Sequence, residues 1–262
     1  MIISLFCFLG CYNFPMTESE NESKFKVTAR REGKPSGIKA KGIRRPNSSE
    51  LPALRERALS RTRAAIVDQA RDLPLGERIS LPLQPHLQKH DNSCLLAASI
   101  SIGEGLARHQ GRLAAFNEAY LAGQARAQGL LSGAGMHTER TASRDAVQHF
   151  LERNLGIHIN HLDPREPEEM GWAAVNIISE GNLFLLNSYS HWVAIYGLNK
   201  LSDRDINWLM VDPLASTLQQ LSTTQLAERI IGTTLTGPSG SPGEIFVVEV
   251  PKPSFIVKSV RR

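Results

Sequence analysis

The strongest constraint on the fold of this chain is a change in sequence period at Gly181. Before Gly181 the chain is rich in helix formers, and Leu95, Ile102 and Leu106 recur at a helical spacing that places them on one face. After Gly181, short runs of Leu, Val, Ile and aromatic residues alternate with turn residues, as is typical of β-strands. Helices first and strands second predict an α+β domain, in which a helix packs on one antiparallel sheet.

The same periods predict approximate bounds for the individual elements. Helices are expected at residues 51–73, 93–109, 112–129, 143–154 and 166–180. Strands are expected at residues 182–187, 192–198, 207–211 and 244–250. The chain has 262 residues and 41% hydrophobic content, which suffices for one core and an appendage.

The N-terminal part of the chain differs in composition from the rest. Residues 17–63 hold 13 Lys or Arg against 6 Asp or Glu, a net charge of +7 in a chain whose total is +4. This stretch is rich in Ser, Gly and Pro and has too few apolar residues to offset the entropy of ordering it. We therefore expect a disordered basic arm over residues 1–63 and a folded domain over residues 64–262. The arm fits an anionic partner, nucleic acid or anionic lipid, bound through charge alone.

The first fifteen residues are apolar and contain Cys7 and Cys11. Residues 1–15 are interpreted either as a leader or as residues that precede a true start at Met16. The second interpretation is considered because residues 1–15 lack the basic region of a signal peptide. No segment has the length of a transmembrane helix. Without this leader Cys94 is the one cysteine left, which disfavours a disulfide scaffold and fits a thiol in a reducing compartment.

Cys94 is the strongest candidate for a catalytic residue. It follows a polar segment, residues 88–93, and opens a helical run of small residues, so it is expected at a helix N-terminus, where the helix dipole favours thiolate over thiol. His191 opens one apolar run and Asp212 closes the next, which places both at strand ends. A thiol nucleophile, a histidine base and an aspartate that orients the histidine make a catalytic triad.

Two further sets of residues belong to this hypothesis. Gln88 and the backbone N–H of Cys94 are candidate donors to the oxyanion of a tetrahedral intermediate. Other polar residues near the predicted strand ends are alternative partners for the histidine, namely Asn187, Asp203 and Asp205.

These residues resemble the papain-like cysteine peptidase superfamily. Gln88 lies six positions before Cys94, the spacing at which papain-like peptidases place the glutamine of the oxyanion hole. His-Trp-Val-Ala-Ile-Tyr-Gly at 191–197, followed by a strand that ends in Asp-Pro, is similar to the bacteriocin-processing, double-glycine peptidase branch and to related bacterial effector proteases and deamidases. Papain's Gly-Ser-Cys-Trp helix start is replaced here by Ser-Cys-Leu-Leu. The resemblance covers about residues 80–250.

The resemblance implies a papain-like fold, a domain of thiol hydrolase type over residues 64–262, and a cysteine protease that acts on a protein or peptide substrate without a cofactor. It also implies a bacterial effector, secreted into a host cell or held in the bacterial cytoplasm before export. Two alternatives stay open. One is a glutamine deamidase or transglutaminase-like enzyme on the same fold, and the other is a non-catalytic interaction protein that binds through the basic arm.

Metal binding is the remaining chemistry to consider. His86 with His90, and His158 with His161, have the spacing of two ligands on one helix face. No second motif completes either set, and the chain has no His-Glu-x-x-His sequence. No metal site is therefore expected.

Overall fold

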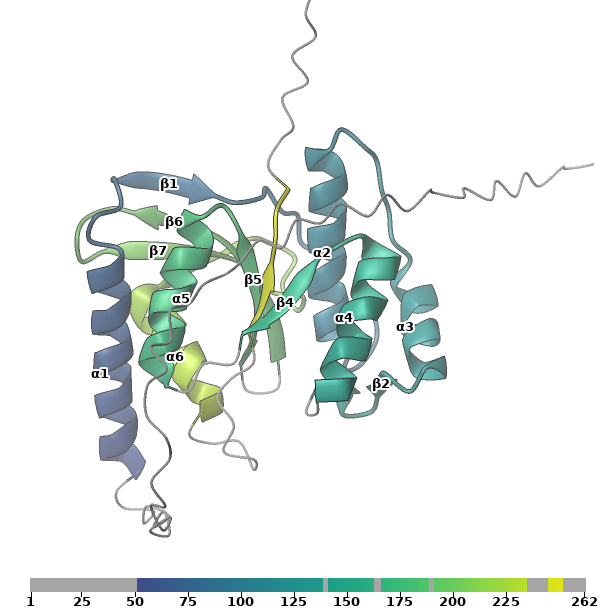
Figure 1. Ribbon diagram of the computed structural model, residues 1–262, viewed down its shortest axis with the longest axis horizontal. Helices are drawn as coiled ribbons and strands as arrows, with labels where there is room; N and C mark the ends of the chain where they lie inside the picture. The colour runs from purple at the N-terminus through teal and green to yellow at the C-terminus, as the bar shows by residue number, and fades with distance from the viewer. Residues whose placement is uncertain (1–50, 139–140, 163–165, 189–190, 235–244, 252–262) are drawn as a thin grey trace, which may run out of the picture. The chain divides into compact units, whose positions relative to one another are not determined.

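The computed structural model describes residues 51–138, 141–162, 166–188, 191–234 and 245–251 (Figure 1). Its helices are α1 (Leu51–Gln69), α2 (Cys94–His109), α3 (Glu118–Ala127), α4 (Thr141–Leu155), α5 (Pro167–Ser179) and α6 (Thr223–Thr234). Its strands are β1 (Gly76–Ile79), β2 (Leu131–Ser132), β3 (Gly135–Met136), β4 (Ile159–Leu162), β5 (Leu183–Ser188), β6 (His191–Lys200), β7 (Ile206–Val211), β8 (Gln219–Ser222) and β9 (Ile245–Val248). The predictions for the leader, and for the basic arm up to residue 50, lie outside the described residues.

Seven of these strands form one antiparallel sheet in the order β4-β9-β5-β6-β7-β8, with β1 also paired to β6. The long strand β6 is the centre of this sheet, and β7 pairs along one of its edges. Its other edge is shared by β5, which pairs with residues 191–195, and β1, which pairs with residues 197–200. Gly197 leaves room for β1, since a Cβ there would stand 2.5 Å from the carbonyl oxygen of Arg78.

Helices cover both faces of the sheet (Figure 1). On one face α2 lies against β6 and β5, and α3 and α4 pack on α2; on the other face lie α5 and α6, with α1 packed on them. Along β6, Trp192 and Ala194 belong to the core on the α2 side, whereas Val193 and Ile195 belong to the core on the α5 side. A strand that is buried on both faces has a continuous run of apolar residues in its sequence. For this reason apolar and polar residues do not alternate along residues 192–195 of β6.

The α+β class with an antiparallel sheet is confirmed, although the sequence predicted fewer elements than the structure contains. The helix expected at 112–129 begins only at Glu118, because Asn117 accepts the backbone N–H of Tyr120 at 3.1 Å and so caps it. Helix α6 and the strands β1, β2, β3, β4 and β8 were not predicted. Within the described residues, no helix has the length and apolar character needed to cross a membrane.

Helix α1 also bears on the expected domain boundary at residues 63 and 64. That boundary falls inside one continuous helix, whose Thr62, Ala65 and Ile66 are buried. Gly171 of α5 allows close packing here, since a Cβ on it would stand 3.1 Å from the carbonyl oxygen of Thr62. Residues 51–63, which the sequence assigns to the arm, are therefore helical in the structure, and the first of them, residues 51–57, are exposed.

A buried lysine fixes the C-terminal end of this helix against the sheet. Lys200, the last residue of β6, is 2% exposed, and its Nζ donates to the carbonyl oxygens of Arg71 at 2.7 Å and Leu73 at 2.9 Å. Nζ also lies 3.0 Å from Oδ1 of Asp203. These three acceptors compensate for the loss of water around a buried ammonium group.

Candidate active site

Cys94, His191 and Asp212 lie where three elements begin or end. Cys94 is the first residue of α2, His191 is the first residue of β6, and Asp212 directly follows β7. Because β6 and β7 are antiparallel, the start of β6 and the end of β7 lie at the same end of the two strands. Helix α2 packs on β6, and the N-terminus of α2 lies at this end of the strands.

The carboxylate of Asp212 is held by several donors. His191 Nε2 donates to Asp212 Oδ1 at 2.7 Å, and the backbone N–H of Leu214 donates to the same oxygen at 2.9 Å. Arg229 of α6 places Nη2 4.0 Å from Oδ2. Burial raises the pKa of Asp212, but the His191 hydrogen bond, the Leu214 N–H and the charges of His191 and Arg229 bring it below its ordinary value. The group is therefore an anion at neutral pH.

His191 lies between this carboxylate and the thiol. Its hydrogen bond to Asp212, followed by that to Cys94, raises the pKa of His191 to about 9, although burial acts in the opposite direction. Since Nε2 faces Asp212, Nδ1 is the ring nitrogen left to face the sulfur. At neutral pH the ring is therefore an imidazolium between two acidic partners.

The thiol of Cys94 is shifted toward its charged form. Cys94 is 8% exposed, and burial raises its pKa, but hydrogen bonds from His191 and from the backbone N–H groups of Trp192 and Leu95 bring the pKa below its ordinary value. Leu95 lies in the first turn of α2, where backbone N–H groups lack helical partners. A thiolate and imidazolium pair, with a carboxylate behind the histidine, is an arrangement able to carry out nucleophilic attack on a carbonyl.

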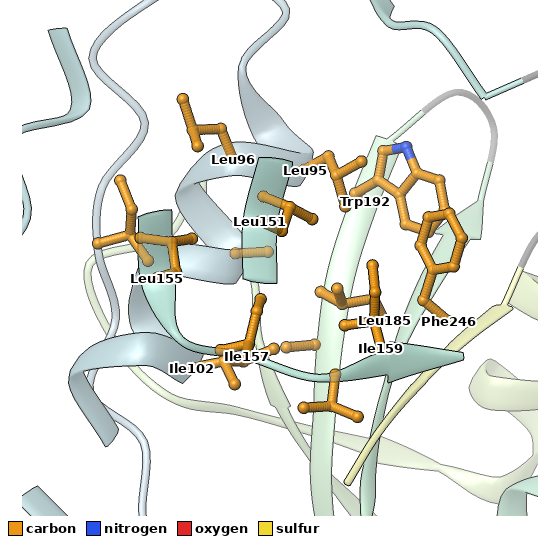
Figure 2. Packing of buried hydrophobic residues seen from close by; sticks show 14 of the residues in the cluster. Leu95, Leu96, Ile102, Leu151, Leu155, Ile157, Ile159, Leu185, Trp192 and Phe246 are labelled. Atoms are coloured by element: carbon orange, nitrogen blue, oxygen red, sulfur yellow. The ribbon is translucent and has the colours of Figure 1, made fainter. Parts of the chain in front are cut away.

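Packing behind the site fixes the start of β6. Trp192, the residue after His191, stacks on Phe246 of β9 with ring centroids 5.1 Å apart and planes 7° from parallel (Figure 2). Leu95 of α2 belongs to the same core as these two rings. The nucleophile and the base are thus each followed directly by a buried core residue, which limits their movement relative to one another.

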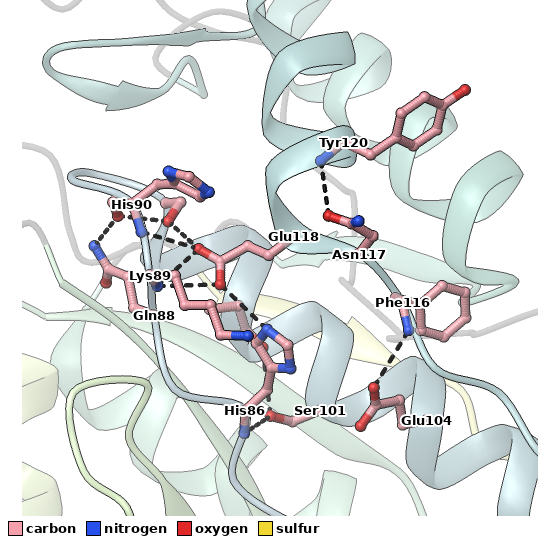
Figure 3. Close-up of polar contacts among 12 residues, drawn as sticks. His86, Gln88, Lys89, His90, Ser101, Glu104, Phe116, Asn117, Glu118 and Tyr120 are labelled. Carbon is pink, nitrogen blue, oxygen red and sulfur yellow. Dashed lines mark hydrogen bonds and ion pairs between the residues drawn. The ribbon is translucent and has the colours of Figure 1, made fainter.

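Gln88 lies beside the other candidate residues, but its side-chain amide has a partner of its own. Its backbone N–H donates to the carbonyl oxygen of Pro213 at 2.8 Å, directly after Asp212. Its Nε2 donates to the carbonyl oxygen of His90 at 2.6 Å (Figure 3), which leaves one amide hydrogen for an oxyanion. Among the described residues, its buried Oε1 has no hydrogen-bond partner.

Two of the three alternative partners of the histidine lie far from it. Asp203 and Asp205 belong to the loop after Lys200, at the opposite end of β6 from His191, about 30 Å away along the strand. Asn187 pairs with Trp192 in the sheet, and its Oδ1 is buried without a partner within the described part of the chain.

The two histidine pairs do not form a metal site in the described residues. His86 Nε2 lies 3.1 Å from Glu118, His158 Nδ1 lies 3.0 Å from Glu152, and His161 meets Phe246 edge to face. In the parts of the chain that the structure describes, no group of three or more His, Cys, Asp or Glu residues is placed to hold a metal ion.

Two residues near the site were missed by the sequence analysis. Arg229 lies on a helix that was not predicted, and Glu118 lies in an expected helix but carries no sequence signal of burial. The predicted residues Cys94, His191 and Asp212 are joined in one hydrogen-bonded chain. Their catalytic roles remain a prediction.

Comparison with known proteins adds little to this geometry. No family model matches the chain, and no curated protein matches it. Among solved structures, UfSP from C. elegans matches with 12% identity and a TM-score of 0.38, over 67% of this chain. The chain spans about a third of that protein, 34% of its length. A likeness at this TM-score supports no argument about fold or activity.

Proposed function

We propose that this chain is a papain-like thiol hydrolase that acts on a protein or peptide substrate, with Cys94, His191 and Asp212 as its triad. The observation that supports the proposal is the continuous hydrogen-bonded chain from the thiol through the imidazole to the carboxylate. The pKa of Cys94 is lowered and that of His191 is raised, which is the combination that a thiolate nucleophile requires.

The reaction follows from the positions of these groups. The Cys94 thiolate attacks the substrate carbonyl carbon, a sulfur–carbon bond forms, and the carbonyl electron pair moves to oxygen. The His191 imidazolium then protonates the leaving amine as the carbon–nitrogen bond breaks, leaving a thioester on Cys94. Water, deprotonated by the now neutral His191, cleaves the thioester and restores the thiolate. Asp212 stabilises the imidazolium in both steps, and Gln88 is the proposed side-chain donor to the oxyanion.

The experiment uses p-nitrophenyl acetate, which reports on thiol acylation without knowledge of the natural substrate. We expect the wild type to release p-nitrophenolate and to carry an acetyl group on Cys94, detectable by mass spectrometry. Cys94→Ala should release none above background. His191→Gln should slow acylation at pH 7 by about 100-fold or more, because the thiol loses the group that deprotonates it. Asp203→Asn is the matched control, since this aspartate lies at the far end of β6.

A wild-type rate equal to that of free cysteine at the same pH would contradict the proposal. If acylation occurs as expected, a protein or peptide pool then separates the outcomes of the reaction. Backbone cleavage produces new amino termini, whereas deamidation of glutamine side chains releases ammonia and leaves the backbone intact.

A further inference from the structure

The polar loop that precedes Cys94 is anchored by a carboxylate from a different helix. Glu118 is the first residue of α3, and its side chain is 1% exposed. A buried carboxylate without partners is strongly unfavourable, so the groups that surround it indicate what holds it in place. All of its hydrogen-bond partners described here come from residues 86–93, the segment that leads into Cys94 (Figure 3).

Four groups of this loop converge on the two carboxylate oxygens. The backbone N–H of Lys89 donates to both oxygens at 3.1 Å, and that of His90 donates to Oε1 at 3.3 Å. The hydroxyl of Ser93 donates to Oε1 at 2.7 Å, and Nε2 of His86 lies 3.1 Å from Oε2. One side chain thus fixes the loop at four points, three of which lie between Gln88 and Cys94.

The loop also needs an external support. Asn92 has a φ of 61°, in the left-handed region that residues other than glycine adopt only at an energetic cost. The carbonyl oxygen of His90 lies inside this turn and accepts a hydrogen bond from Gln88 Nε2 at 2.6 Å. It also lies 2.7 Å from Ser93 Oγ, whose single hydrogen is shared between this oxygen and Glu118. The same peptide segment that binds Glu118 therefore also orients the Gln88 amide.

We infer that Glu118 is a positioning residue that sets the placement of the Gln88 donor relative to the Cys94 sulfur. The inference rests on the proposed function, because it concerns stabilisation of the oxyanion in that reaction. Without the carboxylate, the N–H groups of Lys89 and His90 lose their acceptor, and the loop moves outward to find water. A displacement of about 1 Å in such a group is enough to slow a reaction by about 100-fold.

Two probes separate this role from a general structural one. With p-nitrophenyl acetate, the sulfur attacks a carbonyl, an oxyanion develops, and p-nitrophenolate leaves as its bond to carbon breaks. With iodoacetamide, the sulfur displaces iodide from a saturated carbon, and no oxyanion forms. The ratio of the acylation rate to the alkylation rate therefore measures oxyanion stabilisation, independent of how much thiolate is present.

Glu118→Leu removes both acceptor oxygens while filling the space, and we expect the ratio to fall by about 10- to 100-fold. Gln88→Ala should lower it similarly, and adding Glu118→Leu to that variant should lower it no further, since both changes remove the same donor. Glu118→Gln keeps one acceptor oxygen and should recover most of the ratio. Glu104→Leu is the control, because Glu104 accepts a backbone N–H from Phe116, outside the loop.

A ratio in Glu118→Leu within about twofold of the wild type would overturn the inference, even if the protein is less stable. If Glu118→Leu does not fold, Ser93→Ala removes one of the four contacts, and an unchanged ratio in that variant overturns the inference equally. A wild type that alkylates but never acylates would instead refute the proposed function, and this inference with it.

Discussion

Replacing Asp212 with asparagine should lower the pKa of His191 and narrow the pH range in which the thiolate and imidazolium coexist. Asparagine keeps the shape of the side chain and can still accept the N–H of Leu214, so the geometry should survive. The substitution removes the negative charge of Asp212. The hydrogen bond from His191 to that carboxylate is the largest cause of the raised pKa of His191.

The expected size follows from that raised value. A rise in the pKa of His191 from 6.5 to about 9 corresponds to roughly 3 kcal/mol in favour of the imidazolium, shared between Asp212 and Cys94. His191 is 23% exposed at its side chain, so water screens only part of the interaction. With Asp212 as the larger contributor, the pKa of His191 should fall by about one to two pH units in Asp212→Asn.

The effect on stability has a defined sign. The raised pKa of His191 adds stability that is complete below about pH 6.5 and is lost as the pH rises through about 9. The lowered pKa of Asp212 adds stability that is present above about pH 4 and is lost as the pH falls. The wild type should therefore exceed Asp212→Asn in unfolding free energy most clearly between about pH 4 and 6.5, and least at about pH 10.

The assay is an NMR titration of the histidine ring signals, in which His191 is assigned by its absence in His191→Gln. Urea unfolding at about pH 6 and pH 10 supplies the stability difference. Asp205→Asn serves as the control, since it removes an exposed aspartate in the loop at the opposite end of β6 from His191. A wild-type midpoint near 6.5, or an unchanged midpoint in Asp212→Asn, would refute the reasoning.

Three further predictions concern the fold. Lys200→Met should lower the unfolding free energy by about 2–3 kcal/mol in urea titrations, because the carbonyl oxygens of Arg71 and Leu73 lose a charged, buried donor, while thiol alkylation stays unchanged. Gly197→Ala should destabilise by about 2 kcal/mol or more, because the new Cβ meets backbone at 2.5 Å, whereas Gly123→Ala, in an open position of α3, should stabilise by up to about 1 kcal/mol in the same titrations. Deleting residues 1–50 should leave the melting temperature of the folded part within a few degrees, whereas also deleting residues 51–63 should lower it clearly, since that segment forms part of α1.

The sequence predicted the elements that have a strong and uninterrupted period. Helix α2 and strands β5, β6 and β7 lie close to their expected bounds, because their apolar residues recur over many positions. Strands β1 and β8 are short and largely polar, so their pairing with β6 and β7 provides a stability that no local pattern reveals. Helix α6 begins with threonines, which are weak helix formers, and it is held by burial of its apolar face.

The candidate site divides in the same way. Cys94, His191 and Asp212 are detectable because each stands at a visible boundary between a polar and an apolar run. Glu118 is not detectable, since a glutamate in a helix is ordinarily exposed, and only the fold shows that it faces the loop of residues 86–93. Arg229 was not detectable either, because it is far from Asp212 in the sequence and only the fold brings the two side chains together.

The position of β9 in the sheet has a consequence for the order of folding. This strand pairs with both β4 and β5, although it follows every other described element in the chain. Contacts so distant in sequence form late, and during synthesis they must wait until β9 itself has left the ribosome. Phe246, which stacks on the residue after His191, arrives with that strand. A nascent chain that lacks β9 therefore carries Cys94 without the Phe246 contact behind its base, and full thiol reactivity should appear only after β9 has emerged and paired.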